Sequence, residues 1–86
     1  MIRVSWMDSS SYTKYVKAVC VDFSEGGLRL EVPEPIPLRT YIFLRADRIK
    51  LVGTASVRSV ARHGAKYLLG VELSEPLRTD PLEIET

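Results

Sequence analysis

Short runs of alternating hydrophobic and polar residues recur along the whole chain. In the clearest of them, Leu28, Leu30 and Val32 alternate with Arg29 and Glu31. This period of two is typical of a β-strand with one buried face, because successive side chains of a strand point to opposite sides. Runs of this kind predict strands at residues 2–6, 15–21, 28–32, 40–45, 50–60 and 67–73.

The segments between these runs carry turn and breaker residues. Three prolines fall within residues 33–37, which excludes a paired central strand and favours a stiff connector. Gly64 predicts a hairpin turn, because glycine accommodates left-handed backbone. From residue 75 the alternation fades. We therefore expect one domain over residues 1–75 and, over residues 76–86, a tail that is either a short helix or disordered.

Short strands with frequent turns and no convincing helix favour an all-β barrel or sandwich. A closed barrel is preferred because a small open sheet would leave its edge strands exposed. The alternation also predicts the core of this barrel. The expected core residues are Val21, Leu28, Leu30, Ile42, Leu44, Val57, Leu69 and Val71.

Composition narrows the class of protein. The chain has 86 residues and a formal net charge of +1, so a DNA or RNA binder that depends on phosphate contacts is not expected. No apolar run approaches membrane-spanning length, and the first residues lack the apolar centre of a signal peptide. The single cysteine, Cys20, excludes an internal disulfide. Together these features predict a cytoplasmic protein without a membrane span.

One local pattern stands out between the second and third predicted strands. Asp22, Ser24 and Gly27 have the spacing D-x-S-x-x-G. Aspartate and serine side chains bond to nearby backbone groups, and glycine tolerates a positive φ. Taken alone, the spacing predicts a hairpin turn held by its own side chains.

With two further motifs, the chain resembles the PilZ domain, a bacterial receptor module for cyclic di-GMP. Asp22, Ser24 and Gly27 match the D/N-x-S-x-x-G motif of that family. Residues 53–58 resemble its G-x-x-x-V-R strand, and residues 70–73 resemble its closing G-V-x-F strand, with leucine in the last position. The resemblance covers most of the chain. It implies a six-stranded antiparallel β-barrel of the split-barrel type and a function in bacterial signalling.

The resemblance also implies a ligand. Cyclic di-GMP presents two guanines and two phosphates, and arginine can bind either phosphate or the guanine O6/N7 edge with two hydrogen bonds. A carboxylate such as that of Asp22 can accept from the guanine N1–H and N2 groups. Small residues such as Ser24 and Gly27 let the backbone approach the ring. Cyclic di-GMP is thus the ligand candidate, and no other cofactor is expected.

The chain departs from the family at the R-x-x-x-R arm, which usually precedes the motif aspartate by about twenty residues or more. Arg3 is the only arginine of the N-terminal part, and Met7 stands four residues after it. Either the arm lies upstream of this chain or it has been lost. The cations that could substitute are Arg58, Arg29, Arg62 and Lys66. Arg58 ranks first because the match to the V-R motif places it on a strand. We therefore expect ligand binding by Arg58 and Arg3 beside the motif turn.

Catalysis and metal binding are not expected. His63 and Cys20 are too few for a metal site, and no nucleophile motif is present. Two interpretations remain open. In one, the chain is a cyclic di-GMP sensor. In the other, it is a degenerate PilZ-fold adaptor that binds a protein partner without nucleotide. The sequence does not identify that partner or the oligomeric state.

Overall fold

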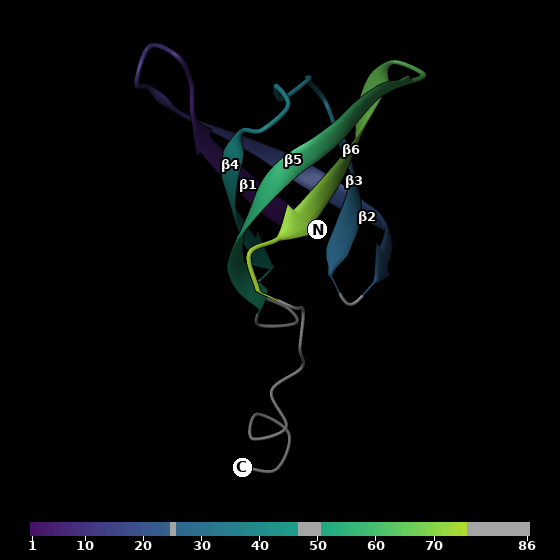
Figure 1. Cartoon of the computed structure of the whole chain (residues 1–86). Helices are drawn as coiled ribbons and strands as arrows, with labels where there is room; N and C mark the ends of the chain where they lie inside the picture. Colours follow the sequence, from purple (N-terminus) through teal and green to yellow (C-terminus); the bar gives the residue numbers. More distant parts are fainter. Residues whose placement is uncertain (25, 47–50, 76–86) are drawn as a thin grey trace.

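The alternating runs form six β-strands that close into an antiparallel barrel (Figure 1). The computed structural model describes residues 1–24, 26–46 and 51–75; the predicted tail at 76–86 lies outside them. The strands are β1 (Ile2–Met7), β2 (Thr13–Ser24), β3 (Gly27–Val32), β4 (Tyr41–Ala46), β5 (Leu51–His63) and β6 (Lys66–Leu73). Their order around the barrel is β1-β2-β3-β6-β5-β4, and β4 closes the ring against β1. The predicted six-stranded antiparallel barrel is confirmed.

The core is made by side chains that face inward from all six strands. Seven of the predicted core residues are buried: Leu28, Leu30, Ile42, Leu44, Val57, Leu69 and Val71. The alternation located these positions because aliphatic residues recur at every second position of these strands.

The prediction for Val21 is wrong, since its side chain is 52% exposed. On β2 the inward positions include Ala18, which is buried, and Cys20, which packs against the core. Val21 follows Cys20 and forms a bulge: Cys20 pairs with Leu30 and Asp22 pairs with Arg29, so Val21 has no partner on β3. Both faces of β2 carry apolar residues, and the alternation could not tell them apart.

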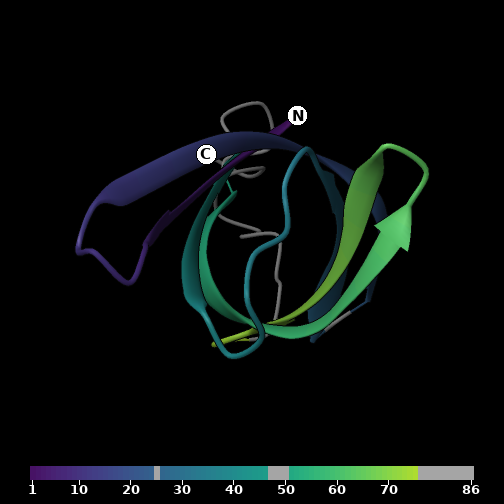
Figure 2. The same cartoon turned by 90° about the horizontal axis from the view of Figure 1, so that it is seen from above.

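The connector between β3 and β4 closes one end of the barrel. Ile36, in the proline-rich segment, is completely buried. Figure 2 shows this segment crossing the opening of the barrel. Backbone hydrogen bonds fix its far end, because the Arg39 amide donates to the Val57 carbonyl at 2.8 Å and the Val57 amide donates to the Thr40 carbonyl at 3.0 Å. The expected stiff connector thus also contributes to the core.

Two other local features hold the ends of β5 and β6. Gly64 has a φ of 63° in the β5–β6 hairpin, as predicted for this turn. The Ser74 hydroxyl lies 3.0 Å from the Tyr41 hydroxyl and 2.7 Å from that of Thr54. The hydrogen bond with Ser74, and to a smaller extent that with Thr54, lowers the pKa of the Tyr41 hydroxyl.

Within the described part of the chain, no helix is long and apolar enough to cross a membrane.

Candidate functional site

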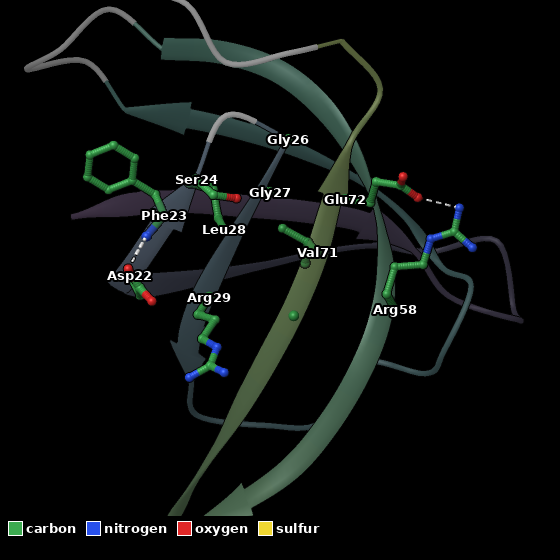
Figure 3. A pocket seen from close by; sticks show the side chains of 11 residues that line it. Asp22, Phe23, Ser24, Gly26, Gly27, Leu28, Arg29, Arg58, Val71 and Glu72 are labelled. Carbon is green, nitrogen blue, oxygen red and sulfur yellow. Dashed lines mark hydrogen bonds and ion pairs between the residues drawn. The ribbon is translucent and has the colours of Figure 1, made fainter.

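An open depression lies on the outer wall of the barrel, between the β2–β3 turn and β5 (Figure 3). Its cavity volume is about 610 Å³. The strands β2, β3, β5 and β6 all contribute. It is lined by Asp22, Phe23, Ser24, Gly26, Gly27, Leu28, Arg29, Arg58, Gly70, Val71 and Glu72. The predicted motif turn therefore forms one side of the depression.

Two glycines leave the middle of this wall without side chains. Gly27 pairs with Glu72, and Gly70 pairs with Arg29, so the two glycines are diagonal neighbours on β3 and β6. A Cβ at position 27 would lie 2.7 Å from the carbonyl oxygen of Val71. A Cβ at position 70 would collide with the hydroxyl of Ser59. Glycine at both positions lets a ligand approach the backbone closely.

The bulge at Val21 determines where Asp22 points. Because Asp22 pairs with Arg29, both side chains belong to the outer face of the barrel. The Asp22 Oδ1 atom accepts a hydrogen bond from the Phe23 amide at 2.8 Å. Within the described residues, no hydrogen bond reaches Asp22 Oδ2. The carboxylate therefore has a second oxygen available to accept from a donor in the depression.

Ser24 and Gly27 face each other across the tight β2–β3 turn. Ser24 is exposed, and its hydroxyl has no hydrogen-bond partner among the residues that the structure describes. The turn is tied to β6, because the Leu73 amide donates to the Gly26 carbonyl at 2.9 Å. This bond supports the rim of the depression from the neighbouring strand.

Two arginines supply positive charge on either side of the glycines. Arg58 follows Val57 on β5, where a second bulge interrupts the pairing with β6, and it forms an ion pair with Glu72. Arg29 forms no ion pair with any other described residue. Figure 3 shows Arg29 and the Arg58–Glu72 pair on opposite sides of β6. With Asp22 and Glu72 present, the four charges of the depression cancel.

The depression brings together four of the five residues that the sequence proposed for binding: Asp22, Ser24, Gly27 and Arg58. Arg29, named only as a substitute cation, is a fifth member. Arg3 does not line the depression. It lies on β1, where its cross-strand neighbours are Lys17 and Arg45. The remaining substitute cations, at the β5–β6 turn, are also outside the lining.

Sequence reasoning missed Gly70 and Glu72. A glycine between Leu69 and Val71 in a buried strand indicates a close approach, and this signal was present in the sequence. The contact of Glu72 with Arg58 had no local signal, because it depends on the register of β5 against β6 and on the bulge after Val57.

Comparison with known families gives one match. The model of the family described as PilZ domain matches residues 1–85. Comparisons with curated proteins and with solved structures gave no significant match.

Proposed function

Because the chain belongs to the PilZ domain family, a family of cyclic di-GMP receptor-type modules, we propose that it binds cyclic di-GMP in the depression on its outer wall. The observation that carries this proposal is the gathering of Asp22, Ser24, Gly27 and Arg58 around one cavity. The chain would act as a cytoplasmic bacterial signalling module that works by binding rather than by catalysis.

The chemistry of the depression suits a guanine nucleotide. Asp22 Oδ2 can accept from the guanine N1–H and N2 groups, while Ser24 offers a hydroxyl beside it. Gly27 and Gly70 leave room for a flat base or a phosphate against the backbone. Arg29 and Arg58 can donate to phosphate or to the guanine O6/N7 edge.

The missing R-x-x-x-R arm sets the expected strength of binding. Arg58 is already held by Glu72, which leaves Arg29 as the arginine of the depression without an ion pair to a described residue. A charge-assisted hydrogen bond contributes on the order of 1.5–3 kcal/mol, and about 1.4 kcal/mol is tenfold in affinity. Without the arm, we expect weak or unmeasurable binding of cyclic di-GMP.

The register of β1 supports a test by grafting. Ile2 pairs with Ala18 and Arg3 pairs with Lys17 in antiparallel order. Residues added ahead of Met1 would therefore continue along β2 toward Asp22. An R-x-x-x-R arm grafted there would approach the motif side of the depression.

Calorimetric titration with cyclic di-GMP tests the proposal on three chains: the chain as it stands, the arm-bearing chain, and the arm-bearing chain with Asp22→Ala. We expect binding only in the second, with Lys66→Ala as the control that leaves it unchanged. Tight binding to the chain as it stands would show that Arg29 and Arg58 suffice and that the argument about the arm is wrong.

The second candidate function is that of an adaptor that binds a protein without nucleotide. The observation that favours it is the Arg58–Glu72 ion pair, which neutralises a cation of the depression. Failure of the arm-bearing chain to bind cyclic di-GMP would support the adaptor, and Asp22 and Ser24 would then be turn residues only.

A further inference from the structure

A second cavity, which we call the end cavity, lies between the β1–β2 loop and the proline-rich connector. Its volume is about 450 Å³. Figure 1 shows this loop and the connector at the upper end of the barrel, whereas β3 begins at the lower end, beside the depression. No described residue lines both cavities. The lining of the end cavity includes Trp6, Met7, Asp8, Lys14, Pro35 and Pro37.

The apolar walls of the end cavity are held in place by the barrel itself. Trp6 is only 4% exposed, so its indole is an inner wall packed on the core. Pro35 and Pro37 flank Ile36, whose buried side chain anchors both prolines to the barrel end. Proline has a fixed φ, which stiffens this second wall. The cavity is therefore formed before any ligand arrives, as is usual for binding sites.

Asp8 is fixed on the side of the β1–β2 loop. Its Oδ1 atom accepts hydrogen bonds from the amides of Ser10 at 2.8 Å and Tyr12 at 3.0 Å. Its own amide donates to the Tyr12 carbonyl at 2.8 Å, and Ser11 completes the turn with a φ of 67°. Within the described residues, no hydrogen bond reaches Asp8 Oδ2. This oxygen can accept from a donor in the end cavity.

The charges around the end cavity leave Asp8 uncompensated. Lys14 Nζ lies 3.1 Å from Glu34 Oε2 and 5.7 Å from the centre of the Trp6 ring, so this cation already has an anionic and an aromatic partner. Asp8 forms no ion pair with any residue that the structure describes. An apolar cavity with one unbalanced carboxylate is complementary to a cation carried on an apolar stem.

We propose that the end cavity receives an arginine side chain from a segment of a partner protein. In this arrangement the guanidinium donates to Asp8 Oδ2, and the aliphatic stem packs between Trp6 and the two prolines. Arginine suits these walls better than lysine because its flat guanidinium also packs on ring faces. The end cavity shares no described residue with the depression, so the proposal goes beyond cyclic di-GMP binding and does not rest on it.

The surroundings favour a protein segment over a small amine. Met7 and Tyr12 on the loop and Leu38 on the connector are all exposed, although they are large and apolar. A small amine would leave these side chains in water, whereas a peptide that inserts its arginine would cover part of them. An anionic ligand fits poorly, because Lys14 is already paired and Asp8 would repel it.

The experiment starts from a random-peptide library selected against the folded chain. We expect the selected peptides to contain arginine next to apolar residues, and replacement of that arginine by glutamine should abolish binding. Trp6 is the single tryptophan of the chain and does not line the depression. A change in its fluorescence during titration therefore reports binding at the end cavity.

Two variants of the chain test the role of charge. In Asp8→Asn the amide oxygen can still accept from the Ser10 and Tyr12 amides, but the negative charge is lost, so peptide affinity should fall by about tenfold or more. Glu34→Gln should lower it by up to about fivefold, because Lys14 then adds an unbalanced positive charge.

The matched control is Glu75→Gln, which removes an exposed carboxylate after β6, outside the end cavity, and should leave peptide affinity unchanged. Circular dichroism of each variant separates loss of binding from loss of fold. The proposal is overturned if no peptide is selected, if the selected peptides lack arginine, or if Asp8→Asn binds them as tightly as the unchanged chain. It is also overturned if agmatine, a guanidinium compound without a peptide backbone, or phosphatidylglycerol vesicles bind more tightly than the selected peptides.

Discussion

Two glycines shape the depression because they carry no side chain. Gly27 and Gly70 keep the outer faces of β3 and β6 bare, and their neighbours show two different constraints. The close neighbour of Gly27 is the backbone oxygen of Val71, which cannot rotate away. The close neighbour of Gly70 is the side-chain hydroxyl of Ser59, which can. Gly27 is therefore required by the fold itself.

Gly27→Ala should destabilise the chain by roughly 1–3 kcal/mol, because the new methyl group would force β3 away from Val71. Gly53→Ala is the matched control, since a Cβ at that position meets no atom within 4 Å. It should stabilise by roughly 0.4–1 kcal/mol through the unfolded chain. Urea denaturation measures both. Equal midpoints for the two variants would contradict the close contact at Gly27.

Leu69→Ala should lower the free energy of unfolding by roughly 2–5 kcal/mol, the usual cost of truncating a buried leucine. Val21→Ala should change it by less than about 0.5 kcal/mol, because Val21 is on the outer surface. Chemical denaturation of the two variants compares them directly. A large loss for Val21→Ala would mean that the outer face of β2 is covered.

The burial of residues followed from the sequence wherever one face of a strand is polar. Leu28 and Leu30 are flanked by Arg29 and Glu31, so their direction was predictable. The direction of Val21 was not predictable, because Val19, Cys20 and Val21 are all apolar and the bulge after Cys20 interrupts the alternation.

Strands and their bulges determine how the residues of the depression meet. The bulge at Val21 on β2 places Asp22 opposite Arg29, and the bulge after Val57 on β5 places Arg58 within reach of Glu72. Each bulge sits on a strand at the border of the depression. Bulges re-aim side chains in this way and are common next to functional sites.

Glu72→Gln should raise the affinity of the arm-bearing chain for cyclic di-GMP, because it releases Arg58 from its ion pair. Exposed ion pairs contribute about 0.2–1 kcal/mol, so the gain should be up to about fivefold. The matched control is Glu31→Gln, which removes the β3 partner of His63 on β5, outside the depression. Calorimetry that shows weaker binding for Glu72→Gln would assign Glu72 itself to ligand contact.

The existence of all six strands was predictable, but their pairing was only partly so. Strands joined by short turns, such as β2 and β3, are expected neighbours. The pairing of β3 with β6 joins segments far apart in the sequence, and it brings Gly70 and Glu72 to the motif turn. The motif turn was therefore recognisable in the sequence as a local pattern. The positions of Gly70 and Glu72 beside it depend on the pairing of β3 with β6 in the closed barrel.

Closure of the barrel gives the whole molecule a single core and two unlike outer walls. The depression occupies the wall around β6, and the wall around β1 lies on the opposite side of the ring. Sequence composition gives a net charge of +1 for the whole chain and does not locate the charges on the surface. Which charges share a wall becomes known only with the strand order, which brings Arg58 and Glu72 together in the depression.

The end of the barrel is sealed by a residue that belongs to no strand. Ile36 is completely buried among the core side chains, although it stands between prolines in the connector from β3 to β4. The prolines predicted an extended segment but did not show which of its aliphatic side chains faces the core. Leu38, two residues later, is 59% exposed and provides a comparison within the same segment.

Ile36→Ala should therefore destabilise the chain by roughly 2–5 kcal/mol, as expected for a buried isoleucine whose cavity cannot collapse against a rigid barrel end. Leu38→Ala should cost less than about 0.5 kcal/mol. Because the core is one cluster, the Ile36→Ala chain should still unfold in a single transition with an unchanged dependence on urea concentration. Denaturation followed by both fluorescence and circular dichroism checks this. Two separate transitions, or equal losses for Ile36→Ala and Leu38→Ala, would show that the connector is not part of the core.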